Sequence, residues 1–239
     1  MITIRNLRPE NITVITFDCY GTLIDWESGI WEAFRSAAAC DGVRLDREEV
    51  LAAYHAIEPM VEGGTFRPYR EVLRETARRV AEECGWTISA GQTSFLPASL
   101  AGWPPFPDTN AALTRLARRY RLGILSNVDE DLLTGTLRSL DVEFGFWVTA
   151  DRVESYKPDL AHFEAARPFV GDSAGWLHAA QSLFHDVGPA NIIGLPVVWV
   201  NRKAERRPAE GPLPDHEVPD LAALAEWLKV AGEMASDEV

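Results

Sequence analysis

The sequence predicts an α/β protein, with a doubly wound parallel sheet and an inserted helical cap. Short apolar, β-branched runs alternate along most of the chain with segments of helical periodicity, as in a parallel sheet covered by helices. These runs lack a regular alternation of apolar and polar residues, which is typical of strands buried on both faces. One long segment near the N-terminus breaks the pattern, because it has helical periodicity throughout.

Five runs are predicted to be strands, with helices between and after them. The strands are expected at residues 12–17, 122–125, 146–149, 176–180 and 196–200. The helices that alternate with them are expected at residues 110–120, 132–140, 160–167 and 221–230. Residues 202–219, rich in Arg, Glu and Pro, are predicted to form a surface loop.

The inserted helical segment is expected to span residues 26–104, with helices at 32–39, 47–61 and 69–84. Its far boundary is the proline-rich stretch 103–107, which would act as a stiff hinge. Residues 1–25 and 105–239 would then form the sheet domain. A chain of 239 residues has room for such a core domain with a smaller insertion.

The composition indicates a soluble globular protein. Apolar residues make up 46% of the chain and charged residues 25%, which suffices for a large core and a hydrated surface. The formal net charge of −13 repels phosphate backbones and anionic lipids, so we expect no nucleic-acid or membrane partner. The three cysteines lack metal-site spacing, and no signal peptide or membrane span is recognised. These features predict a cytoplasmic protein with reduced thiols.

Polar residues follow the predicted strands at the sheet edge where α/β proteins bind their ligands. They are Asp18 and Thr22 after the first strand, Ser126 and Asn127 after the second, Lys157 after the third and Asp186 after the fourth. A carboxylate that ends a buried strand needs a compensating role, because burial of charge is costly. Taken singly, each residue has an ordinary alternative. The aspartates would cap a helix or turn, the Ser–Asn pair would form a turn, and the lysine would be solvated.

The polar residues belong to four motifs that occur in a fixed order. The motifs are FDCYGTL at 17–23, LSN at 125–127, SYKPD at 155–159 and HD at 185–186. In these motifs, and in the position of the helical segment, the chain resembles the haloacid dehalogenase superfamily. Within that superfamily it is similar to the 2-haloacid dehalogenases. The resemblance covers nearly the whole chain and implies a Rossmann-like core with a cap.

The resemblance also implies a role for each residue. Asp18 would be the nucleophile that forms an ester with the substrate, and Thr22 would orient it. Ser126 and Asn127 would hold the negative charge of the substrate or of the leaving group. Lys157 would balance the charge of the nucleophile, because a nearby ammonium favours an ionised carboxylate.

Four further residues complete the expected site. Asp186 would position or activate water for hydrolysis of the ester. His185 beside it would be either a base near the ester or a hydrogen-bonded structural histidine. Arg67 and Arg70 are the candidates in the cap for binding the substrate carboxylate or halide. Their ordinary alternative is a pair of solvated helix charges.

Tyr20 separates the dehalogenase pattern from the phosphatase pattern, and we place it among the substrate-binding residues. Phosphatases of the superfamily carry a second aspartate at this position, as the acid for the leaving oxygen. A tyrosine, with an ordinary pKa of about 10, has no proton to transfer at neutral pH, and a halide needs none. Gln181 and Ser182 also replace an expected pair of magnesium-binding acids. No cofactor is therefore expected, although Asp18 and Asp186 alone could hold a loose magnesium ion.

The expected function is hydrolytic dehalogenation of a short 2-haloacid to a 2-hydroxy acid through an aspartyl ester. The expected partner is a small anionic organic substrate, and a homodimer is implied by resemblance. One alternative is a phosphatase of the superfamily, or a hydrolase of another small electrophile. A different alternative is a non-catalytic member of the fold that binds a small ligand.

Overall fold

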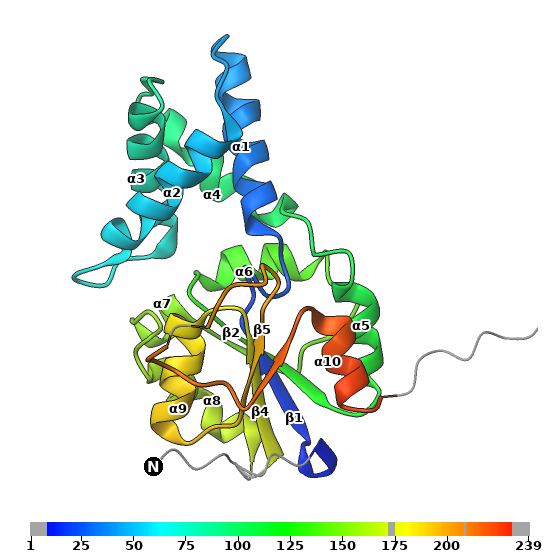
Figure 1. Ribbon diagram of the computed structural model, residues 1–239. Coiled ribbons are helices and arrows are strands. Elements are labelled where there is room, and N and C mark those ends of the chain that lie inside the picture. The colour runs from blue at the N-terminus through cyan, green and yellow to red at the C-terminus, as the bar shows by residue number, and fades with distance from the viewer. Residues whose placement is uncertain (1–8, 172–174, 208, 231–239) are drawn as a thin grey trace, which may run out of the picture.

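The computed structural model describes residues 9–171, 175–207 and 209–230. Its centre is a parallel sheet with the strand order β3-β2-β1-β4-β5-β6 (Figure 1). The strands are β1 (Val14–Phe17), β2 (Arg121–Ser126), β3 (Phe146–Thr149), β4 (Trp176–Ala180), β5 (Val197–Val200) and β6 (His216–Val218). The predicted α/β fold class is confirmed. The direction of winding reverses between β1 and β4, so the carboxyl ends of these two strands mark the place where such sheets bind ligands.

β6 was missed by the sequence analysis, which assigned residues 202–219 to a surface loop. The strand has three residues and lies at the edge of the sheet, where Val218 is paired with Val200 of β5. So short an edge strand, with prolines at 214 and 219, leaves no apolar run for a sequence pattern to detect.

Helices cover both faces of the sheet because successive side chains of each strand point to opposite sides. In β1, Ile15 and Phe17 join one apolar cluster and Val14 joins the other. The first cluster includes α5 (Thr109–Ala117), α6 (Glu130–Leu137) and α10 (Leu221–Trp227). The second includes α8 (Ala161–Val170) and α9 (Gly188–Ile193), and the short α7 (Ala150–Val153) follows β3. Figure 1 shows α5 and α10 on one side of the sheet and α8 and α9 on the other.

A group of helices between β1 and α5 stands over the carboxyl ends of the strands (Figure 1). It consists of α1 (Trp26–Cys40), α2 (Arg47–Glu62), α3 (Tyr69–Glu83) and α4 (Phe95–Ser99), with 3-10 turns at Gln92–Ser94 and Leu100–Gly102. We call these elements the cap helices. Gly29 of α1 packs so closely on Trp103 that an added Cβ would lie 2.2 Å from the indole ring. In the described part of the chain, no helix has the length and apolarity needed to cross a membrane.

Candidate active site

Asp18 lies directly after β1, in a turn that returns the chain toward the cap helices. Its backbone N–H donates to Ala179 O of β4 at 3.2 Å, which fixes it at the point where the winding of the sheet reverses. Gly21, at a φ of +95°, provides the backbone conformation that the turn requires. The hydroxyl of Thr22 donates to Asp18 Oδ2 at 2.8 Å and accepts the backbone N–H of Gln181 at 2.9 Å. The turn therefore fixes one carboxylate oxygen of Asp18.

Lys157 joins the two aspartates of the site. Its Nζ donates to Asp18 Oδ1 at 3.0 Å, to Asp186 Oδ1 at 2.6 Å and to the carbonyl of Leu125 at 2.9 Å. An ammonium has three N–H groups, so all of them are used within this buried cluster. Lys157 is 1% exposed, and so buried a charge needs such partners to be tolerated. The structure thus brings together residues that lie 139 positions apart in the sequence.

Asn127 holds the backbone of Lys157 rather than its ammonium. Its Nδ2 donates to Lys157 O at 3.0 Å, and its Oδ1 accepts from Lys157 N at 2.7 Å. The amide oxygen and one N–H are therefore occupied, and the second N–H remains for the negative charge that Asn127 was expected to hold. Ser126 ends β2, and its Oγ is buried without a partner in the described structure. Of the two residues, Ser126 is therefore the one whose side chain is wholly free to donate to a ligand.

The buried charges of the cluster stabilise one another. Burial raises the pKa of Asp18 above its ordinary value, although Lys157 opposes the effect. Burial would also raise the pKa of Asp186, but the Lys157 ammonium and the bond from His178 hold it well below its ordinary value. The two carboxylates, in turn, outweigh burial and raise the pKa of Lys157. At neutral pH the lysine is therefore a fixed cation between two acidic groups.

A chain of buried hydrogen bonds orients Asp186. Trp176 Nε1 donates to Thr16 Oγ1 at 2.8 Å, and Thr16 Oγ1 lies 2.9 Å from His178 Nδ1. His178 Nε2 lies 3.0 Å from Asp186 Oδ1. Because an indole N–H is only a donor, the Thr16 hydroxyl can donate to Nδ1, which leaves the proton on Nε2 for the carboxylate. The other oxygen of Asp186, Oδ2, is buried and has no partner in the described structure.

Tyr20 points away from the nucleophile. Its hydroxyl lies 2.8 Å from Thr136 Oγ1 of α6, and burial raises its pKa well above the ordinary value of 10. Tyr20 therefore has no proton to exchange with a leaving group at neutral pH. The residues also fit magnesium poorly. Two carboxylates that share a bonded ammonium leave few of the hard oxygen ligands that magnesium requires.

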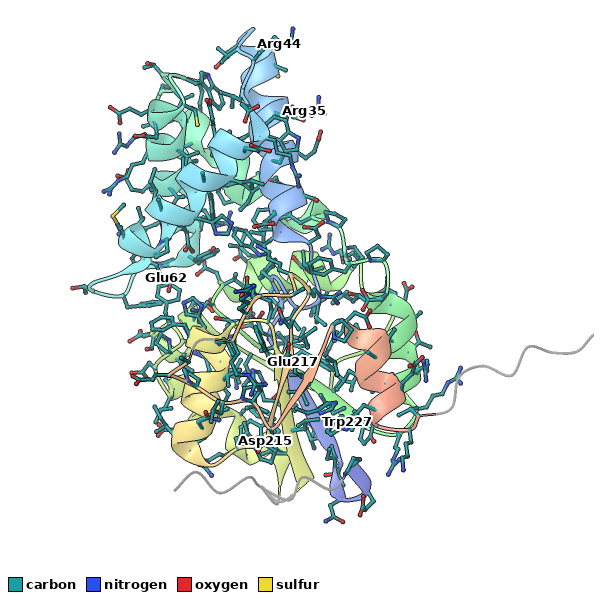
Figure 2. All side chains as sticks on the ribbon, viewed as in Figure 1. Arg35, Arg44, Glu62, Asp215, Glu217 and Trp227 are labelled. Carbon is teal, nitrogen blue, oxygen red and sulfur yellow. The ribbon has the colours of Figure 1, made fainter. Side chains whose placement is uncertain are left out.

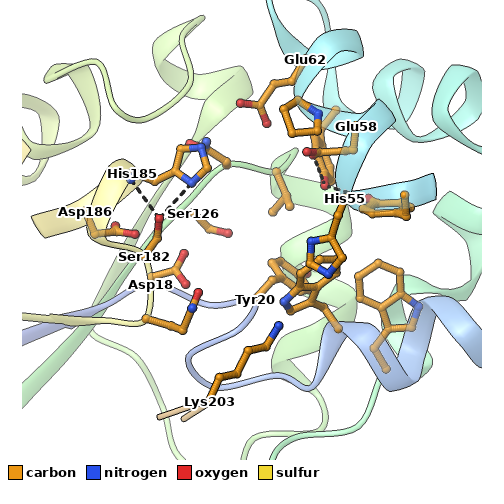
Figure 3. A pocket seen from close by; sticks show the side chains of 18 of the residues that line it. Asp18, Tyr20, His55, Glu58, Glu62, Ser126, Ser182, His185, Asp186 and Lys203 are labelled. Atoms are coloured by element: carbon orange, nitrogen blue, oxygen red, sulfur yellow. Dashed lines mark hydrogen bonds between the residues drawn. The ribbon is translucent and has the colours of Figure 1, made fainter. Parts of the chain in front are cut away.

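A cavity of about 350 Å³ lies between this cluster and the cap helices. Its lining includes most of the expected residues, namely Asp18, Tyr20, Ser126, Asn127, His185 and Asp186. The cap side contributes Tyr54, His55, Glu58, Glu62 and Tyr69. Figure 3 shows Asp18 and Asp186 on one side of this cavity and Glu58 and Glu62 on the other.

Arg67 and Arg70 do not line this cavity. The guanidinium of Arg67 is turned toward the carbonyl of Val61, and that of Arg70 binds Asp131 of α6. Arg67 precedes α3 and Arg70 lies in its first turn, and each guanidinium is directed to an acceptor outside the cavity. The geometry therefore does not support the expected role of these two residues in binding a substrate carboxylate.

The sequence analysis missed the acidic pair of the cap helices. Glu58 and Glu62 lie one turn apart on α2, and Figure 2 shows Glu62 at the end of the cap nearest the sheet domain. Burial raises the pKa of Glu62 to about 8, and repulsion from Glu58 adds to the effect. Burial also raises the pKa of Glu58, which accepts a hydrogen bond from Tyr69 at 3.0 Å. Their four-residue spacing was visible, but nothing in the sequence showed which face of α2 meets the cavity.

His185 lies on the sheet side of the same cavity. Its Nδ1 is 3.1 Å from Ser182 Oγ, and its backbone N–H donates to that oxygen at 2.9 Å. Burial lowers the pKa of His185 below its ordinary value, so the ring is neutral at neutral pH. A neutral imidazole fixed by one ring nitrogen can accept a proton.

Comparisons with known proteins agree with this arrangement. Residues 12–171 match the model of the haloacid dehalogenase-like hydrolase family. The (S)-2-haloacid dehalogenase of Pseudomonas sp. (strain YL) is 25% identical over 237 residues, which cover 95% of this chain and 98% of that protein. Haloacetate dehalogenase H-2 of Moraxella sp. (strain B) is 26% identical over 226 residues, 92% of this chain and 100% of that protein.

A solved structure shares the fold. The L-2-haloacid dehalogenase of Xanthobacter autotrophicus with chloropropionic acid covalently bound superposes with a TM-score of 0.79 and 20% identity. The match covers 91% of this chain and 98% of that one. Fold, motif residues and family model agree over most of the chain, which confirms the resemblance seen in the sequence. The chain belongs to the haloacid dehalogenase-like hydrolase family.

Proposed function

We propose that the protein hydrolyses the carbon–halogen bond of a short 2-haloacid and releases a 2-hydroxy acid and halide. The observation that carries the proposal is the Asp18–Lys157–Asp186 cluster, in which the Lys157 ammonium lies 3.0 Å from Asp18. Tyr20 in the same cavity stands where a phosphatase of the superfamily has its second acid. Two relatives that the chain matches over nearly their whole length are a haloacid dehalogenase and a haloacetate dehalogenase.

In the first step, an oxygen of Asp18 would attack the carbon that bears the halogen. The new C–O bond forms as the carbon–halogen bond breaks, and the halide leaves with the bonding pair. No proton is needed, in keeping with the position of the Tyr20 hydroxyl on Thr136. The free hydroxyl of Ser126 and the second amide N–H of Asn127 would stabilise the departing negative charge. Thr22 and Lys157 would hold Asp18 in the attacking geometry.

In the second step, water would attack the carbonyl carbon of the Asp18 ester. The ester bond to the substrate breaks, Asp18 regains its carboxylate, and the 2-hydroxy acid is released. Asp186 Oδ2, buried and unpartnered in the described structure, would hold the water. Lys157 would stabilise the negative oxygen that forms during the attack. One proton of the water would pass to the neutral ring of His185 or to solvent, and the other would protonate the departing substrate oxygen, which becomes the hydroxyl of the product.

We further propose that the reaction needs no magnesium, because the donor set described above fits that ion poorly. The substrate would be a small organic anion from the cytoplasm, and the protein would act without nucleic acid or membrane partners. The homodimer implied by the family resemblance belongs to the same proposal.

A substrate panel tests the proposed function. Purified protein is incubated with 2-chloro and 2-bromo acids, and halide and 2-hydroxy acid are both quantified. A parallel panel of phosphate esters is run with magnesium and with a chelator, and Asp18→Ala is the control. We expect equal amounts of halide and hydroxy acid, unaffected by the chelator and absent in Asp18→Ala. Magnesium-dependent phosphate release without dehalogenation would contradict the proposal.

A further inference from the structure

The sheet domain contributes a cation to the substrate cavity. Among the described residues that line this cavity, Lys203 is the one lysine or arginine. It lies three residues beyond β5, over the carboxyl end of the sheet. Lys157 has all of its donors engaged beside Asp18. A substrate anion in the cavity would therefore meet Lys203 as the cation with spare donors.

The loop that carries Lys203 is anchored. Arg202 forms a bidentate salt bridge with Asp108, in which Nη1 lies 2.8 Å from Oδ1 and Nη2 lies 3.2 Å from Oδ2. Its Nε donates to Thr22 O at 2.9 Å. Its guanidinium also lies over the Phe106 ring, 4.0 Å from the centroid. These contacts fix the backbone next to Lys203 and tie the loop to the turn that orients Asp18. A cation on a fixed backbone recognises a ligand at a lower entropic cost than one on a mobile loop.

The ammonium itself is held at the cavity wall. Lys203 Nζ lies 2.7 Å from Glu27 Oε1 and 5.9 Å from the centre of the Trp26 ring. His55 Nε2 contacts the same Glu27 oxygen at 2.7 Å. Figure 3 shows the Lys203 side chain extending toward the interior, on the side of Tyr20. With one N–H given to Glu27, two more remain for a ligand, which matches the two oxygens of a carboxylate.

The opposite wall can also accommodate an anion. Glu58 and Glu62 are the carboxyl groups on that side, and the raised pKa of Glu62, about 8, keeps it protonated at neutral pH. Burial raises the pKa of Glu58 in the same direction. A protonated carboxyl donates a hydrogen bond instead of repelling an anion. Glu205, two residues after Lys203 on the same loop, is the remaining acid of the lining outside the nucleophile cluster.

We propose that Lys203, and not an arginine of the cap helices, binds the carboxylate of the substrate. The inference rests on the proposed function, since it names the residue that makes the same site prefer 2-haloacids to uncharged organohalogen compounds. The cavity of about 350 Å³ equals the space of about a dozen water molecules. It therefore has room for a carboxylate at Lys203 together with a halogen-bearing carbon at Asp18.

Two matched pairs of small molecules test the role of Lys203. The first pair is 2-chloropropionate and its neutral amide, compared by kcat/KM. The second pair is the product acid, 2-hydroxypropionate, and its amide, compared by Kd from calorimetry, which requires no turnover. The variants are Lys203→Met, Lys203→Arg and Lys229→Met. Lys229 is an exposed lysine just beyond α10 and serves as the matched control for loss of one positive charge.

For Lys203→Met we expect kcat/KM for the acid to fall by about 10- to 100-fold, as for loss of a charged hydrogen bond, and little change for the amide. The Kd of the product acid should rise by a similar factor. Lys203→Arg should restore much of the loss, and Lys229→Met should behave as wild type. Equal effects of Lys203→Met on acid and amide, or an unchanged Kd for the product acid, would overturn the inference. If no haloacid is turned over but acid binding still depends on Lys203, the proposed reaction fails and the assignment of Lys203 stands.

Discussion

His178 Nε2 lies 3.0 Å from Asp186 Oδ1, and both side chains are completely buried. The contact closes the chain Trp176–Thr16–His178–Asp186 and leaves Asp186 Oδ2 as the oxygen without a partner. His178 does not line the cavity, so any effect it has on the reaction acts through the orientation of Asp186.

Replacement of His178 by leucine should therefore slow hydrolysis of the ester more than its formation. Loss of a hydrogen bond to a charged group corresponds to about a tenfold or larger decrease in rate. Rapid-quench kinetics would then show a burst of halide followed by slow turnover, with the Asp18 ester accumulating. Thr16→Val, which removes the bond to His178 Nδ1, should produce a weaker effect in the same direction. An equal slowing of both steps, or slowing that only parallels a loss of folded protein, would assign His178 a merely structural role.

Lys157→Ala should slow ester formation by more than about 100-fold. Burial and repulsion from Asp186 would then raise the pKa of Asp18 against the hydrogen bond from Thr22 alone, so that Asp18 is protonated and weakly nucleophilic over more of the working pH range. The measurement is the single-turnover rate of halide release against pH. In the variant, the rise of this rate with pH should occur at a higher pH than in the wild type.

Stability must be followed in the same Lys157 variants. Removal of one partner from a buried ion pair costs about 3–5 kcal/mol, so thermal melts set the temperature at which the rates are compared. Lys157→Arg should recover only part of the rate, because a planar guanidinium does not reproduce the three bonds of the ammonium. A folded Lys157→Ala protein with wild-type rates would show that the cation is not needed by Asp18.

The fold and the nucleophile cluster were predictable from sequence for a physical reason. Strands buried on both faces leave continuous apolar runs, and the polar residues at their carboxyl ends must meet at one edge of a parallel sheet. Asp18 and Asp186 both follow buried strands in this way. The place of Lys157 at this edge could be predicted in the same way, because its motif follows β3.

The residues that face the substrate from other elements could not be predicted in this way. In the sequence, nothing distinguishes Lys203 from the other charged residues of its polar loop. Its position at the cavity follows from the contact of the neighbouring Arg202 with Asp108, which fixes the loop. Arg67 was expected at the cavity, yet its guanidinium binds the carbonyl of Val61, which is close to it in the sequence. Such competition between local and distant partners depends on side-chain geometry, which sequence spacing does not specify.

The affinity for a haloacid should weaken above about pH 8. Glu62 is protonated below the pKa of about 8 and ionised above it, because burial and the neighbouring Glu58 raise that pKa, whereas Lys157 opposes the shift. Loss of the proton places a negative charge across the cavity from Lys203, so KM for an acid rises as the pH increases through this value. Steady-state kinetics from about pH 7 to about pH 9 would measure the rise.

Glu62→Gln is the variant that isolates this effect. It keeps the size of the side chain and removes its ionisation, so KM should stay nearly constant over the same pH range. The neutral amide substrate should show little pH dependence of KM in either protein. A KM for the acid that is independent of pH in the wild type, or that rises equally in Glu62→Gln, would contradict this assignment.

Tyr20→Phe should retain activity within a factor of about three, because the hydroxyl contacts Thr136 and not the nucleophile. The loss of one buried hydrogen bond should lower the free energy of unfolding by about 1 kcal/mol. Denaturant unfolding and halide release measure the two effects separately. A loss of more than about 100-fold in turnover with unchanged stability would mean that the hydroxyl takes part in the chemistry.

The covalent role of Asp18 is the central claim, and a single turnover in water labelled with the heavy oxygen isotope tests it most directly. Enzyme in excess over a 2-haloacid is quenched after one turnover, and both the Asp18 peptide and the product are analysed by mass spectrometry. Because water attacks the carbonyl carbon of the ester, the label should enter Asp18, and the first product should carry the unlabelled oxygen that Asp18 held before the reaction. Label in the product, with Asp18 unlabelled, would show that water attacks the substrate directly and would contradict the account.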